Sequence, residues 1–192
     1  MLSSSNLKEK TQEFLKPFAE NVGNLGISPN AVTLTGFILS ALSGILLGAG
    51  NLFNGTVLLA LSGACDVFDG ILARTTKKTT KFGAFLDSFL DRYADFFPLA
   101  GLAYLGHSTG DELLFLGSLF SVAGSFSTSY ARARAESLGV ECKVGLLERP
   151  ERVILLLLGL ALGYPAETTV LLALLSNFTA LQRLFCALEE LR

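Results

Sequence analysis

The chain has 192 residues, of which 51% are hydrophobic and 17% charged, and its mean hydropathy is +0.52. Soluble domains carry about 25% charged residues, so this composition argues against a soluble globular protein. The formal net charge of -2 shows no basic excess, so the whole chain has no electrostatic footprint for binding nucleic acid. Cys65, Cys142 and Cys186 share no metal or redox spacing, and we interpret all three as helix or loop filler.

Residues 1–28 form a polar N-terminal segment. Charged residues interrupt every apolar run in it, so it is not a secretory signal. Over residues 6–21 apolar residues recur at about helical spacing, which predicts an amphipathic helix lying on a membrane surface; a soluble leader helix is the alternative. These apolar residues are Leu7, Phe14, Leu15 and Phe18.

From residue 29 to residue 192 the chain consists of apolar stretches, most of them long enough to cross roughly 30 Å of hydrocarbon. Joints containing Gly, Asn or Pro separate these stretches. We therefore predict an all-α integral membrane protein with six transmembrane helices that follow the N-terminal amphipathic juxtamembrane helix. The predicted spans are residues 31–50, 54–74, 83–105, 112–132, 152–164 and 166–187, of which the fifth is short.

Lysine and arginine are confined to alternate connections. They precede the first span, lie between the second and third and between the fourth and fifth, and close the chain, whereas residues 50–54, 106–111 and 163–167 contain none. By the positive-inside rule, both termini and the two basic loops are cytoplasmic. An even number of spans in the cell membrane agrees with two ends on the same side.

Four aspartates interrupt the second and third spans near their cytoplasmic ends, where an unpaired charge costs several kcal/mol. They are Asp66, Asp69, Asp87 and Asp91. At 100° per residue the first pair shares one helix face and the second pair shares another, and both faces begin at the same basic loop. Oxygen ligands without nearby His or Cys suit hard cations, so we predict bound divalent ions, which are Mg²⁺, Mn²⁺ or Ca²⁺.

Small and cationic residues accompany the aspartates. Gly70 and Gly83 would let a bulky planar ligand approach the backbone, and Arg74 offers a planar donor fork to a phosphate. The alternative is a set of helix-end ion pairs, with glycines that serve close helix packing. Four aspartates on two converging faces favour the functional interpretation, whereas we interpret Asp95 as a partner of Arg92 or a polar neighbour.

The spacing Asp-x2-Asp-Gly-x2-Ala-Arg-x8-Gly-x3-Asp-x3-Asp, from Asp66 to Asp91, resembles the complete signature of the CDP-alcohol phosphatidyltransferases. This resemblance implies a six-helix membrane fold, a homodimer and a two-metal site (Mg²⁺ or Mn²⁺) open to the cytoplasm. It implies that Asp66, Asp69 and Asp87 hold one ion. It also implies that Asp66, Asp87 and Asp91 hold the second, with Asp91 as general base.

The same resemblance implies a binding site for the CDP-linked lipid. A segment at the start of the first span is similar to the family segment that closes over the cytidine. Gly83 joins this set because it lacks a side chain on the aspartate face. The predicted CDP-lipid-binding residues are Asn30, Ala31, Val32, Thr33, Gly70, Arg74, Thr80 and Gly83.

Residues 129–136 and 144–152 resemble the branch of the family that makes phosphatidylinositol phosphate or archaetidylinositol phosphate. The resemblance implies that Arg132, Arg152 and Arg183 grip the phosphate of the acceptor, inositol phosphate; Arg132 replaces a more frequent lysine. Independently, an acceptor with its own phosphate requires a cationic pocket beside the metal site. For Arg134 and Arg149, a role in the positive-inside signal alone is an equal alternative.

We therefore expect transfer of a phosphatidyl or archaetidyl group from a CDP-linked lipid to inositol phosphate, with release of CMP. A sister enzyme that uses glycerol 3-phosphate is the closest alternative. A divalent-cation transporter is another, but it predicts acidic residues through the full depth of the bilayer. The sequence does not distinguish a diacyl ester from an archaeal ether lipid.

Overall fold

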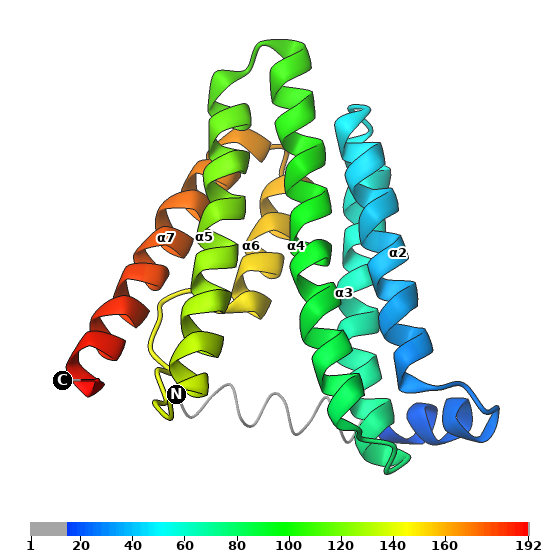
Figure 1. Ribbon diagram of the computed structural model, residues 1–192. Helices are drawn as coiled ribbons and strands as arrows, with labels where there is room; N and C mark the ends of the chain where they lie inside the picture. Colours follow the sequence, from blue (N-terminus) through cyan, green and yellow to red (C-terminus); the bar gives the residue numbers. More distant parts are fainter. Residues whose placement is uncertain (1–14, 192) are drawn as a thin grey trace.

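The computed structural model describes residues 15–191, and these residues contain helices and connections but no strand (Figure 1). Each of the six predicted spans corresponds to a helix. In chain order they are α2 (Pro29–Gly48), α3 (Leu52–Thr75), α4 (Lys81–Thr109), α5 (Glu112–Ser137), α6 (Arg149–Ala161) and α7 (Pro165–Glu190). Helix α2 packs against α3 and α4, α4 against α5, and α5 against α7, while α6 contacts α3 and α7.

Residues 15–24 form a further helix that lies across the ends of the long helices (Figure 1). Ala19 is fully buried against Ile71 and Leu72 of α3, and the ring of Phe18 lies 5.3 Å from that of Phe68. The described part of the predicted amphipathic helix therefore packs on α3, while Leu7 and Phe14 lie outside the described residues.

Helices α2, α3, α5 and α7 are long and apolar enough to cross a membrane. Helix α6 has 13 residues and so extends only about 20 Å, which is shorter than the hydrocarbon core. Helix α4 has 29 residues but carries the charges of Asp87, Asp91, Arg92 and Asp95. Length and composition thus support an α-helical membrane protein with four candidate spans.

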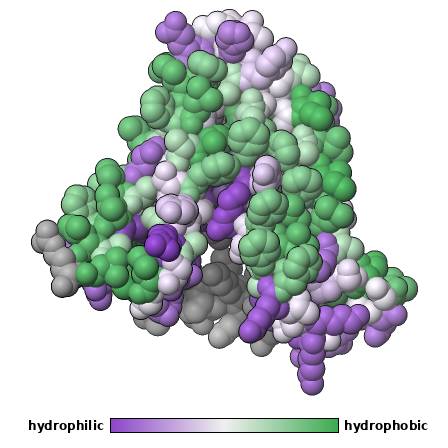
Figure 2. Space-filling view, viewed as in Figure 1, coloured by the Kyte–Doolittle hydropathy of each residue, from purple (hydrophilic) through white to green (hydrophobic). Residues whose placement is uncertain are grey.

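The distribution of side chains is that of a membrane protein. Large apolar residues lie on the outside, and Figure 2 shows them over much of the visible face, with hydrophilic residues in a hollow between the helices. Buried positions hold many small polar residues. Ser121 Oγ and Thr128 Oγ1 of α5 donate hydrogen bonds of 2.8 and 2.9 Å to carbonyls of α7, a frequent mode of helix association in lipid.

Two features fix α4, which carries half of the predicted metal ligands, against α2. A Cβ on Gly101 would collide with the backbone carbonyl of Gly44, so the glycine pair permits close approach of the helices. Pro98 lacks an N–H group and cannot bond to the carbonyl of Ala94. Ser40 Oγ of α2 donates to that carbonyl at 2.6 Å, and α4 continues without a break.

The interpretation of the cysteines as filler is wrong for two of them. Cys142 and Cys186 form a disulfide that ties the connection between α5 and α6 to the C-terminal part of α7. Cys65 of α3 is a free thiol. The two cysteines are 44 residues apart, so no local sequence motif indicates that they pair. Their pairing depends on how the connection folds onto α7.

Candidate active site

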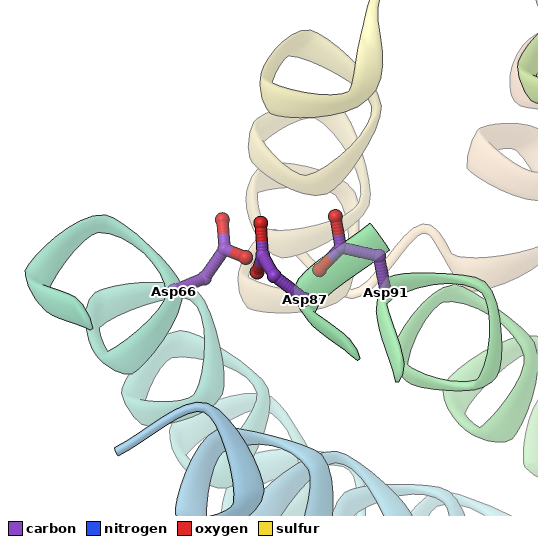
Figure 3. Close-up of side chains that lie close together, drawn as sticks. All are labelled: Asp66, Asp87 and Asp91. Atoms are coloured by element: carbon purple, nitrogen blue, oxygen red, sulfur yellow. The ribbon is translucent and has the colours of Figure 1, made fainter. Parts of the chain in front are cut away.

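Three of the four predicted metal ligands converge between α3 and α4. Single carboxylate oxygens of Asp66, Asp87 and Asp91 lie within 4.8 Å of one another, and Figure 3 shows the three carboxyl groups facing a common space. Asp87 and Asp91 are four residues apart on α4 and thus share a face. Asp87 Oδ1 is buried and has no hydrogen-bond partner among the described residues. An oxygen cluster with an unsatisfied buried acceptor fits a hard divalent cation.

Asp69 lies outside this group of three. Its carboxylate is buried, and Oδ2 accepts a hydrogen bond of 2.6 Å from Thr33 Oγ1 of α2. Asp69 and Asp87 both line a neighbouring cavity of about 170 Å³, so the cluster adjoins that cavity through Asp87.

This first cavity, which we call the glycine cavity because Gly70 and Gly83 line it, is formed by the start of α2, the end of α3 and the start of α4. A Cβ on Gly70 would lie 3.4 Å from Arg74 Nη1, and a Cβ on Gly83 would lie 3.0 Å from Thr80 Oγ1. The two glycines therefore keep the cavity open beside a guanidinium. The predicted residues that line it are Asn30, Thr33, Gly70, Arg74, Thr80 and Gly83.

The other two residues predicted to bind the CDP-lipid lie elsewhere. Ala31 is exposed, and its N–H bonds to Ser28, the N-cap of α2. Val32 packs against the cluster formed by Ala19, Ile71 and Leu72. Successive residues of a helix point 100° apart, so Asn30 and Thr33 share the cavity face while Ala31 and Val32 turn away from it.

A second cavity of about 390 Å³, the basic cavity, lies beside the aspartate cluster. All three residues predicted to hold the acceptor phosphate line it, together with two further arginines and Ser88, Ser129, Glu136 and Glu148. Guanidinium groups suit phosphate because they donate in a planar fork. The arginines are Arg92, Arg132, Arg149, Arg152 and Arg183.

The three predicted phosphate ligands are held in different ways. Arg183 is 4% exposed and donates to the carbonyls of Val144 and Thr128 at 3.0 and 2.9 Å, which also anchors the connection before α6. Arg152 is 5% exposed and pairs with Asp95 at 3.1 Å. Arg132 is more exposed and pairs with Glu136 at 2.9 Å, one turn along α5.

The structure gives Arg149 a central position that the sequence analysis left open. Its Nη1, Nη2 and Nε atoms lie 2.8 Å from Asp66, 3.0 Å from Asp91 and 3.2 Å from Asp95. The interpretation of Asp95 as a partner of Arg92 is wrong, because Asp95 faces the start of α6 and pairs there with Arg149 and Arg152. A sequence signal was present, since two arginines three residues apart share the face at the start of α6.

Residues 26–187 match the CDP-alcohol phosphatidyltransferase family, and the chain belongs to that family of enzymes. The chain is 37% identical over 187 residues to archaetidylinositol phosphate synthase of Methanothermobacter thermautotrophicus, with 94% of this chain and 92% of that protein covered.

Solved structures show the same relationship. Mycobacterium tuberculosis phosphatidylinositol phosphate synthase with CDP-DAG bound has a TM-score of 0.84 and 31% identity, and the match covers 91% of this chain and 94% of that one. The same enzyme in complex with manganese and citrate also has a TM-score of 0.84 and 31% identity, with 90% and 88% covered. A divalent metal in that relative agrees with the aspartate cluster of this chain.

Proposed function

We propose that this protein transfers the phosphatidyl or archaetidyl group of a CDP-linked lipid to inositol phosphate and releases CMP. The observation that carries the proposal is the position of the aspartate cluster. Its member Asp87 lines the glycine cavity, and Arg149, which pairs with Asp66 and Asp91, lines the basic cavity. The names of the relatives agree with a CDP-linked donor and a phosphorylated inositol product.

In the proposed reaction a hydroxyl of inositol phosphate attacks the phosphorus that carries the lipid. Asp91 accepts the hydroxyl proton, the bond from this phosphorus to the CMP oxygen breaks, and Arg74 donates to the departing phosphate. Two divalent cations, Mg²⁺ or Mn²⁺, held by Asp66, Asp69, Asp87 and Asp91, would polarise the diphosphate and acidify the hydroxyl.

The donor and the acceptor occupy different cavities in this proposal. Asn30, Thr33, Gly70, Thr80 and Gly83 surround the cytidine end of the donor. The phosphate of the acceptor lies in the basic cavity, where Arg132, Arg152 and Arg183 donate to it. A cavity with five arginines suits an acceptor that carries its own phosphate better than choline, ethanolamine or serine.

The experiment uses purified protein with Mg²⁺ and measures CMP release. CDP-diacylglycerol and CDP-archaeol serve as donors, and inositol phosphate, free inositol and glycerol 3-phosphate serve in turn as acceptors. We expect CMP only with inositol phosphate. Release only with glycerol 3-phosphate would overturn the acceptor assignment, and no release with any acceptor would overturn the enzymatic assignment in favour of a cation transporter or an inactive lipid-binding protein.

We also propose six membrane segments, with both termini and the active site on the cytoplasmic side, and a homodimer. Alternate connections without Lys or Arg support this topology. Single cysteines introduced at His107 and Lys78 provide the test in intact cells. We expect a membrane-impermeant maleimide to label the cysteine at position 107 and not the one at position 78. For the homodimer, we expect chemical cross-linking in membranes to yield a dimer.

A further inference from the structure

Arg149 belongs to both halves of the site. Its guanidinium pairs with Asp66 and Asp91, two members of the aspartate cluster. The same residue lines the basic cavity and a small cavity beside Asp66, Asp69 and Asp91. Arg149 is therefore part of the wall between the predicted metal site and the predicted acceptor site.

Arg149 and a divalent cation compete for the same two carboxylates. The terminal nitrogens of Arg149 pair with the Oδ1 atoms of Asp66 and Asp91, and both carboxylates belong to the cluster that suits a hard cation. A cation in the cluster would also repel a guanidinium at this distance. We therefore expect a cation in the cluster to displace the two terminal nitrogens of Arg149.

The contacts of Arg149 allow such a displacement without loss of its anchor. Nε, the nitrogen nearest to the side-chain stem, bonds to Asp95, which is not part of the cluster. Arg152 pairs with the other oxygen of Asp95 and keeps this carboxylate in place. Because the guanidinium is rigid and planar, its terminal nitrogens leave Asp66 and Asp91 when the whole group turns about the contact between Nε and Asp95. The larger of the two cavities that Arg149 lines is the basic one.

We propose that Arg149 is a positioning residue that exchanges between the aspartate cluster and the acceptor phosphate, so that metal binding and acceptor binding favour each other. Without a cation in the cluster, Arg149 offsets part of the negative charge of the aspartates. With the cation bound, its terminal nitrogens turn into the basic cavity and donate to the phosphate of the acceptor. The acceptor half of this inference rests on the proposed function, whereas competition with the metal does not.

The first test measures Mn²⁺ affinity of the purified protein by calorimetry, with no substrate present. Because Arg149→Gln removes the competing guanidinium, we expect Mn²⁺ to bind at least about tenfold more tightly than in the wild type. Arg149→Lys retains the positive charge but not the planar guanidinium, so its Mn²⁺ affinity should lie between those of the wild type and Arg149→Gln. Unchanged or weaker Mn²⁺ affinity in both variants would overturn the proposal.

Arg92→Gln is the matched control, because Arg92 lies 3.9 Å from Asp91 and also lines the basic cavity. It removes a neighbouring positive charge without freeing an oxygen from a close ion pair, so we expect its Mn²⁺ affinity to change by less than about threefold. An increase as large as that of Arg149→Gln would show a general charge effect and would overturn direct competition.

The second test measures the affinity for inositol phosphate with and without saturating Mn²⁺. Mn²⁺ should raise the affinity for inositol phosphate to some extent in every protein, because metal and phosphate attract each other directly. The decisive quantity is therefore the difference in this gain of affinity between the wild type and each variant. We expect the gain in Arg149→Gln to be at least about fivefold smaller than in the wild type, and the gain in Arg92→Gln to resemble that of the wild type. Equal gains in the wild type and Arg149→Gln would overturn the exchange. If inositol phosphate binds none of these proteins, the acceptor assignment is wrong, and the Mn²⁺ result still decides the competition.

Discussion

Replacement of both Cys142 and Cys186 by serine removes the covalent link between the connection before α6 and helix α7. In the chain-entropy view, a disulfide that closes a loop over a separation of 44 residues stabilises the fold by about 4 kcal/mol, because it restricts the unfolded chain. In a chain of this size 1 kcal/mol corresponds to about 2–4 °C in Tm. The double variant should therefore unfold about 10 °C below the wild type.

The assay is thermal unfolding in detergent without reductant, followed by the helical circular dichroism signal. Cys65→Ser is the control, because Cys65 is a free thiol and its loss breaks no cross-link. We expect this control to shift Tm by no more than about 2 °C, as for a mild substitution. Reductant should lower the Tm of the wild type toward that of the double variant. An unchanged Tm in the double variant, or an equal effect of reductant on both proteins, would refute the reasoning.

Three further substitutions test the candidate site through steady-state kinetics of CMP release. Gly83→Ala places a Cβ 3.0 Å from Thr80 Oγ1 and 3.1 Å from Asn30 Oδ1, so the KM for the CDP-lipid should rise about tenfold with the acceptor KM unchanged. Asp91→Asn should reduce kcat at least about 100-fold while Mn²⁺ still binds, and full turnover with bound metal would contradict its role as base. Arg183→Ala should raise the KM for inositol phosphate about tenfold and leave the KM for the CDP-lipid nearly unchanged. Equal increases in both KM values would contradict a place for Arg183 in the acceptor site.

The helices could be predicted from the sequence because their signals are local. Apolar runs separated by joints placed all six helices from α2 to α7, and their ends differ from the prediction by a few residues. The differences have local causes too. Helix α2 begins at Pro29, two residues before the predicted span, because Ser28 caps it and proline suits the first turn.

The aspartates could also be predicted as a group, since fixed spacing on a helix determines a shared face. The spacing did not reveal how each carboxylate is satisfied. Asp69 bonds to Thr33, 36 residues earlier, and Asp95 bonds to Arg149, 54 residues later. The interpretation of Asp95 as a partner of Arg92 or a polar neighbour considered only residues near it in sequence, and for this reason it missed Arg149 and Arg152.

The sequence by itself determined the helical class, the apolar exterior and the aspartates and arginines available to the proposed site, because these depend on composition and on periodicity within one helix. The tertiary structure decided which residues meet. It separated Asp69 from the cluster of three aspartates, joined Cys142 to Cys186, and brought Arg149 between Asp66 and Asp91. These contacts depend on how helices distant in sequence rotate and pack against one another, and residue spacing within a single helix carries no information about that packing.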